Sequence, residues 1–391
     1  DWSSDVCSSD LGWNAPETDR PGLFFGSGAL ALMAALAGLR RAWTRRGEAG
    51  KGLSFGGLAW RAPGRQPGRS LATVTLLASA TFLIVAMAAF RLEARRDAWR
   101  RGSGTGGFTH WIETALPVAA DVRTEKGREA LGFAAADFEK VEAVPVRVRD
   151  GDDASCLNLS KAARPRLLGV DPAVLAGRGS FTFAGFSKGI EPTLGWRCLE
   201  ARPDDDAIPV VGDMASIQYA LQRRLGDVLE LEDGKGGTMR VRLVGALRNS
   251  VLQGSLVMAE ETFRKRFPGE SGWRMFWVES PAAREEATRT AWGKALQDQG
   301  GEVTSMVGRL ERFNAVQNTY LGTFQVLGGL GLLLGSAGLG IVVLRNVHER
   351  RGELAILRAT GFAAGRVRRL VLWEHATLVV LGLVQIGRAH V

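Results

Sequence analysis

The sequence is poor in the residues that build catalytic and metal sites. Its 391 residues include only three cysteines and four histidines. They form no CxxC pair and no cysteine–histidine cluster with zinc spacing, which argues against a structural metal site. The histidines are also too scattered along the chain to support a Ser/His/Asp arrangement. We therefore expect no catalytic residue, no metal ligand and no bound cofactor in this chain.

A phosphate-binding loop is also missing. The glycine-rich stretch GKGGT at 234–238 lacks the GxxxxGK[ST] spacing that wraps backbone amides around a phosphate. It is typical instead of a hairpin turn between the strand-like runs DVLELE and MRVRLV. The sequence therefore predicts no nucleotide site of its own.

The two ends of the chain differ in character from the rest. DVCSSDL can be back-translated to a DNA string whose reverse complement encodes QIGRAHV, the last seven residues. The string resembles a common short-read sequencing adapter, so we expect residues 1–11 and 385–391 to be adapter-derived scars. Removing their three aspartates and one arginine raises the net charge from +9 to +11. The remaining piece is expected to be part of a longer protein, with 12–22 the extracytoplasmic end of a missing preceding segment.

Long charge-free apolar runs dominate the rest of the sequence. Those at 70–90 and 319–344 match or exceed the roughly 30 Å hydrocarbon core of a bilayer when helical, whereas 23–39 is marginal. A further run begins at 370 and is cut by the scar after 384. Buried helices of a soluble protein would normally keep a polar stripe, so we interpret all four runs as transmembrane helices, the last truncated.

Charge in the connecting segments predicts the orientation of these helices. Residues 40–69 hold eight Lys/Arg against one acidic residue, and residues 345–369 hold seven Arg against two Glu. The positive-inside rule makes both segments cytoplasmic. The basic excess therefore belongs to membrane loops rather than to a nucleic-acid surface. We expect a multi-pass protein of the bacterial cell (inner) membrane, with the lipid bilayer as one of its partners.

The segment 91–318 must then lie outside the membrane. Strand-like runs such as VEAVPVRVR, TMRVRLVGAL and RMFWVES alternate with turn signals and with helical patterns at MASIQYALQRRLG and AEETFRKRF. An apolar stripe, repeating every three or four residues, then leads into the third run as a stalk helix; its members are Leu310, Phe313, Val316, Tyr320 and Phe324. The predicted fold class is a membrane protein with transmembrane α-helices and a large inserted extracytoplasmic α+β domain.

Two cysteines fall in this external segment. In an oxidising compartment Cys156 and Cys198 could pair and stabilise the domain by about 2–4 kcal/mol. Two buried free thiols are the alternative, because spacing alone cannot show that the two sulfurs meet. Both possibilities stay open on the sequence alone.

The most specific stretch of the sequence is HERRGELAILRATGFAAGRVRRL, beginning at residue 348. Its pattern predicts a short helix over Glu349–Thr360, with Gly361 as a left-handed C-terminal cap. A second helix should begin near Ala364, with arginines at the headgroup level before it enters the bilayer. Without a partner, this would be an amphipathic hairpin on the inner leaflet.

This stretch resembles the FtsX-like/MacB-type ABC transporter permease family, whose members carry ERRxExAxLRAxG after a long external domain. The resemblance implies a chain without ATPase activity, which docks onto a separate cytoplasmic ABC ATPase subunit that binds ATP. It also implies mechanotransmission, in which helix movement drives the external domain to export or release a substrate. The residues expected to contact the ATPase subunit are Arg350, Glu353, Ile356, Leu357, Arg358, Thr360 and Gly361.

Small residues in the third run predict close helix approach. Gly331 and Gly335 form GxxxG, and Gly328 and Gly338 lie nearby, which favours packing against a second permease core or subunit. The rival hypothesis for the whole chain is a membrane-anchored sensor or receptor with an extracytoplasmic ligand-binding domain. A sensor should continue into a signalling domain, whereas this chain turns back toward the bilayer within about 25 residues of the third run.

Overall fold

The computed structural model describes residues 20–45, 67–89, 94–95, 97–151, 165–201, 206–233, 237–369, 371–373 and 376. The chain divides into two compact units. One is continuous, Leu92–Gln317, and the other combines Asp1–Arg91 with Asn318–Val391. The predicted scars and Cys156 lie outside the described residues, so nothing in the structure bears on them.

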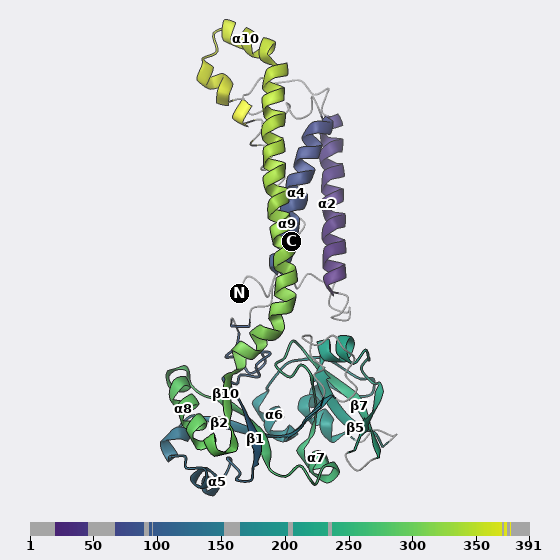
Figure 1. Cartoon of the computed structure of the whole chain (residues 1–391). Helices are drawn as coiled ribbons and strands as arrows, with labels where there is room; N and C mark the ends of the chain where they lie inside the picture. Colours follow the sequence, from purple (N-terminus) through teal and green to yellow (C-terminus); the bar gives the residue numbers. More distant parts are fainter. Residues whose placement is uncertain are drawn as a thin grey trace. The chain divides into compact units, whose positions relative to one another are not determined.

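Helices make up the discontinuous unit. They are α2 (Arg20–Arg45), α4 (Pro67–Ala89), the part of α9 (Met306–Glu349) that follows Gln317, and α10 (Arg351–Ala359) (Figure 1). Among the described residues, two helices are long and apolar enough to cross a membrane, α4 over Ser70–Ala88 and α9. The apolar run at 23–39 does lie within a helix, α2, but that helix is not one of the two.

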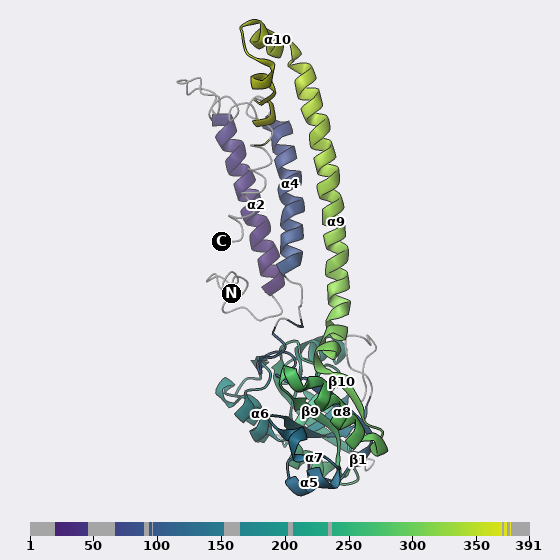
Figure 2. The ribbon, with the colours of Figure 1, turned by 90° about the vertical axis from the view of Figure 1, so that its left-hand side faces the viewer.

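Helices α2 and α4 lie side by side, as both views show (Figure 2). Their contact buries Leu32, Phe82 and Ala86, and Phe25 meets Phe82 edge-on at 6.5 Å between ring centroids. Gly28 makes this approach possible, because a Cβ there would lie 2.6 Å from the Phe82 ring. No pattern in the sequence singles out this glycine.

Ten strands form one sheet in the unit Leu92–Gln317, in the order β10-β1-β9-β2-β3-β8-β5-β7-β4, with β6 also paired to β7. The pairs β3–β8 and β5–β7 are parallel and the others are antiparallel. The strands are β1 (His110–Val118), β2 (Glu142–Arg149), β3 (Arg166–Val170), β4 (Phe183–Phe186), β5 (Ile208–Asp213), β6 (Val228–Glu232), β7 (Thr238–Leu247), β8 (Ser255–Ala259), β9 (Trp273–Glu279) and β10 (Glu302–Ser305).

Short helices cover this sheet. The α-helices are α5 (Glu125–Ala130), α6 (Pro172–Arg178), α7 (Glu260–Arg266) and α8 (Glu285–Ala295). Tighter or wider helical turns are η3 (Ala135–Phe138), η4 (Pro192–Glu200), η5 (Ser216–Ala220), η6 (Ala282–Arg284) and η7 (Gln297–Gln299). The unit is therefore an α+β fold, the class that the sequence predicts for this segment.

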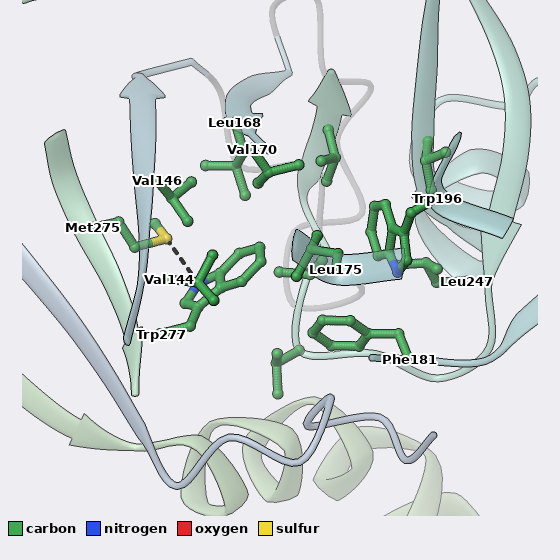
Figure 3. Packing of buried hydrophobic residues seen from close by; sticks show 14 of the residues in the cluster. Val144, Val146, Leu168, Val170, Leu175, Phe181, Trp196, Leu247, Met275 and Trp277 are labelled. Atoms are coloured by element: carbon green, nitrogen blue, oxygen red, sulfur yellow. Dashed lines mark hydrogen bonds between the residues drawn. The ribbon is translucent and has the colours of Figure 1, made fainter. Parts of the chain in front are cut away.

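The core of the unit is built around buried tryptophans. Trp277 lies in the middle of the central cluster and points its indole N–H at the sulfur of Met275, 3.2 Å away (Figure 3). Strands β2 and β3 and helix α6 supply much of the apolar surface around it; the residues from these elements are Val144, Val146, Leu168, Val170 and Leu175. Complete burial of such side chains is worth about 1.5–3 kcal/mol each, so this cluster fixes the sheet.

One local prediction is confirmed only in part. The helical pattern MASIQYALQRRLG is helical over residues 214–220, and η5 ends at Ala220. The carboxylate of Asp213 accepts the N–H of Ala215 at 3.0 Å, which fixes the start of this segment. Gln222 adopts φ +53°, a left-handed conformation that cannot continue a right-handed helix. The chain thereby turns into the loop before β6.

Candidate functional site: the coupling segment and the long helix

The end of α9 and the start of α10 are separated by a single residue. Arg350, with φ −96° and ψ 10°, breaks the helix. The guanidinium of Arg345 lies 2.7 Å from Glu349 before the break, and that of Arg350 lies 3.3 Å from Glu353 across it. Exposed pairs of this kind contribute at most about 1 kcal/mol each. Helix α10 begins at Arg351, two residues later than the sequence predicts.

The C-terminal end of α10 has the predicted left-handed cap. Gly361 has φ +96°, and its N–H donates to the carbonyl of Arg358 at 3.2 Å. The N–H of Phe362 donates to the carbonyl of Leu357 at 3.1 Å, which completes a Schellman motif. Residues 364–369 are helical again, so the helix expected from Ala364 is confirmed.

The surface of α10 is open. No residue of this nine-residue helix is buried by the described part of the chain. The Ile356 side chain is 65% exposed, whereas Leu357 is half-buried. The hydroxyl of Thr360 donates to the carbonyls of Ile356 and Leu357 at 3.1 and 3.0 Å, so its donor is used within the helix. Among the predicted contact residues, the exposed ones are Glu353, Ile356, Arg358, Thr360 and Gly361.

The opposite end of α9 is buried in the sheet unit. Met306, Leu310, Phe313 and Asn314 are all less than 10% exposed, and Met306 and Leu310 belong to the central core. The N–H of Met306 donates to the carbonyl of Thr109 at 2.9 Å. The helix thus begins in the core of the sheet unit and ends one residue before α10.

An ion-pair network that the sequence does not predict lies beside this anchor. The guanidinium of Arg309 lies 4.2 Å from the centre of the Trp111 ring, and the Trp111 N–H donates to Glu113 at 3.1 Å. Arg166 pairs with the same carboxylate. Burial alone would raise the pKa of Glu113, but the hydrogen bonds and charge of Arg166 hold it below its usual value. No local sequence signal relates these residues, because the fold brings them together from separate segments of the chain.

The glycines of α9 divide into two groups. A Cβ on Gly328 would lie 3.1 Å from Ile84 of α4, so this glycine permits close packing inside the chain. Gly331, Gly335 and Gly338 have nothing within 4 Å of the same position. Their packing against a second permease core or subunit stays a prediction.

Cys198 is completely buried and forms no disulfide within the described part of the chain. Burial raises its pKa to about 12, so it is neutral and unreactive at physiological pH. Because Cys156 lies outside the described residues, the pairing of the two cysteines stays a prediction. No group of three or more potential metal ligands occurs among the residues that the structure describes.

The coupling hairpin and the apolar half of α9 coincide with a known family. Residues 326–385 match the sequence profile described as FtsX-like permease C-terminal. Through this segment the chain is similar to FtsX-like permeases. The comparison with curated proteins gave no match.

Two solved structures resemble this chain weakly. The periplasmic region of MacB from Actinobacillus actinomycetemcomitans aligns with 59% of this chain and 98% of its own, at 12% identity and a TM-score of 0.28. The extracellular domain of the noncanonic ABC-type transporter YknZ from Gram-positive bacteria aligns with 50% and 99%, at 13% identity and a TM-score of 0.27. Scores this low carry no argument about the fold. The functional assignment therefore depends on the family match and on the geometry of α9 and α10.

Proposed function

We propose that this chain is the transmembrane permease subunit of an ABC transporter in the bacterial cell membrane. A separate cytoplasmic ABC ATPase subunit binds and hydrolyses ATP and docks onto α10. The observation that carries the proposal is the family match over 326–385, because it includes both the apolar half of α9 and the exposed α10. The chain itself supplies no catalytic residue in this scheme.

The proposed topology follows from charge. Residues 40–69 and 345–369 are cytoplasmic, α4 and α9 cross the bilayer, and the sheet unit Leu92–Gln317 lies outside. Single cysteines introduced near residues 50 and 360 should react with a membrane-impermeant reagent only in permeabilised cells. A cysteine near residue 190 should react in whole cells. Labelling near 360 from outside would contradict the topology.

The proposed coupling uses the continuity of α9. Its 44 residues span about 66 Å at a rise of 1.5 Å per residue. The first turns are held in the sheet core by Met306 and Leu310, and the last turn is joined to α10 through Arg350. A displacement of α10 by the ATPase is therefore carried along a single helix into the core of the sheet unit. We propose that this movement exports or releases a substrate on the outer side of the membrane.

Docking of α10 can be tested at Ile356. Its exposed side chain would be buried against the ATPase, so an aspartate there loses apolar burial and must desolvate a charge. The Ile356→Asp variant should lose at least about 2 kcal/mol of docking energy, roughly thirtyfold in affinity. Ala355→Asp adds the same charge about 100° around the helix from Ile356, outside the face that Glu353, Ile356 and Thr360 share, and is the matched control.

The assay is co-purification with the proposed cytoplasmic ABC ATPase subunit, together with ATP turnover of the reconstituted pair. Ile356→Asp should lower both, Glu353→Lys should have a smaller effect in the same direction, and Ala355→Asp should leave both near wild type. Equal behaviour of all three variants and the wild type would show that α10 is an inert hairpin at the lipid surface.

A further inference from the structure

A polar groove lies beside the start of α9 in the sheet unit. Its volume is about 560 Å³, within the range of cavities that hold small ligands or short peptides. The buried side chain of His110 forms part of the floor, and its Nδ1 lies 2.8 Å from the hydroxyl of Thr109. Strand β10 and the first turns of α8 and α9 form the sides. Nothing in the proposed coupling through α10 uses this groove.

One side of the groove is an open sheet edge. Strand β10 pairs with β1, and no other described strand pairs with it. Because Met306 donates its N–H toward β1, the trans peptide directs the carbonyl of Ser305 away from β1, where it is the first acceptor of α9 and not part of the free edge. Alternation along the strand then directs the N–H of Ser305 and both backbone groups of Val303 to the same open side. These groups face the groove, because Val303, Thr304 and Ser305 all line it.

Acidic and basic side chains both line the groove beside this edge. Glu285 and Glu286 come from the first turn of α8, and Arg312 from α9. Arg289 reaches Glu286 only loosely, at 3.5 Å, and both side chains are more than half exposed. Arg312 is exposed and is held by no ion pair within the described part of the chain. Its guanidinium is thus available to a carboxylate that enters the groove.

We propose that this groove binds an extended, acidic peptide segment of a partner protein by β-strand addition to the edge of β10. The backbone of the segment pairs with Val303 and Ser305, and an acidic side chain meets Arg312. Backbone pairing supplies affinity that depends little on sequence, and the charge contact selects the residue beside it.

The backbone contact can be removed without breaking the sheet. In Ser305→Pro the outward N–H is lost, whereas the pairing of Thr304 with Trp111 remains, and proline is tolerated at such an edge position. The side chain of Ser305 also accepts the N–H of Gly308 at 3.3 Å. Ser305→Ala loses that contact but keeps the N–H, so it is the matched control.

The probe is a fluorescein-labelled peptide of alternating valine and threonine with one central glutamate, titrated by anisotropy against the detergent-solubilised full chain. We expect saturable binding at about 0.1 mM or tighter. Ser305→Pro should weaken it about tenfold, and Ser305→Ala less than about twofold. The same peptide methylated on alternate backbone nitrogens should not bind, because it cannot extend the sheet.

Two variants of Arg312 test its contact with the acidic side chain of the peptide. Arg312→Glu should weaken binding at least about fivefold at low salt, with a smaller difference at high salt, and Arg312→Lys should change it little. Binding of the methylated peptide, unchanged binding by Ser305→Pro, or no saturable binding up to about 1 mM would overturn the proposal. A change in the mass of the solubilised particle on Ser305→Pro would instead show that the groove joins two copies, which also overturns it. None of these readouts requires the ATPase, so they are independent of the proposed function.

Discussion

Gly104 occupies a position where even one methyl group cannot fit. A Cβ there would lie 2.0 Å from the carbonyl oxygen of Asn249 and 3.0 Å from the side chain of Leu310. The neighbour at 2.0 Å is backbone, which cannot rotate away as a side chain can. Asn249 itself is already in a left-handed conformation, with φ +40°. Gly104→Ala should therefore force a loop of the sheet unit out of its place.

The loss of stability in Gly104→Ala depends on the hydrogen bonds that hold this loop in place. The N–H of Val251 donates to the carbonyl of Gly104 at 2.9 Å. The N–H and hydroxyl of Ser250 both donate to Asp213, at 2.7 and 2.9 Å. Overpacking costs about 1–3 kcal/mol, and loss of the hydrogen bond between Val251 and Gly104 adds about 1 kcal/mol. The expected total is about 2–4 kcal/mol.

Thermal unfolding of the full chain in detergent, followed by tryptophan fluorescence, measures this effect, since Trp111 and Trp277 report on the core that contains Leu310. Gly104→Ala should lower the melting temperature by about 5–15 °C for a unit of this size. Gly177 lies inside α6 with nothing within 4 Å, so Gly177→Ala should stabilise by about 0.5–1 kcal/mol. A melting temperature within about 1 °C of wild type for Gly104→Ala would refute the reasoning.

Two further predictions concern a buried carboxyl and the α2–α4 contact. Burial raises the pKa of Asp213 to about 6, although hydrogen bonds from Ser250 and Ala215 favour its charged form. Between pH 6 and about pH 4 the Asp213 carboxyl is therefore protonated in the folded state and ionised in the unfolded state. Protonation of Asp213 should therefore contribute about 2 kcal/mol of added stability as the pH falls from 6 to 4, a contribution that chemical denaturation should no longer show in Asp213→Asn. Gly28→Val should separate α2 from α4 and lower disulfide cross-linking of cysteines placed at Leu39 and Val74. Gly38→Val, at a position with nothing within 4 Å, should not.

The coupling hairpin could be predicted from sequence because its determinants are local. Gly361 is needed wherever a helix ends in a left-handed residue, and the second helix then starts within a few residues. The break at Arg350 was not predictable in the same way. It lies within a continuous helical pattern, and only the charge pairs on its two sides mark it.

The sheet could be predicted from the sequence only in part. The alternating runs that became β2, β6, β7 and β9 are visible in the sequence, whereas β3, β5 and β10 are only four to six residues long and carry no clear alternation. Strand order depends on contacts far apart in the chain, such as the parallel pairing of β3 with β8. The candidate groove beside β10 could not be predicted for the same reason, because β1, α8 and α9 supply its walls.

The glycines of the third run show how a correct pattern can leave its partner undetermined. Small residues such as those of GxxxG allow another helix to approach closely, and at Gly328 the neighbour is Ile84 of α4. The same spacing does not state which helix approaches Gly331 and Gly335. That choice depends on the identity and position of another helix, which a pattern within one segment does not encode.

The exposed fraction of the apolar side chains on α9 rises along the helix. Leu310 and Phe313 are 3% and 7% exposed, whereas Val326, Leu333 and Leu344 are 70% exposed or more. A folded protein rarely leaves a continuous apolar surface of this kind in water. The polar groups of the helix backbone are satisfied internally, so lipid or another apolar helix can cover this surface without further cost. The change from a one-sided apolar stripe to an apolar surface on all sides begins near Tyr320, which is where the proposed topology has α9 enter the membrane.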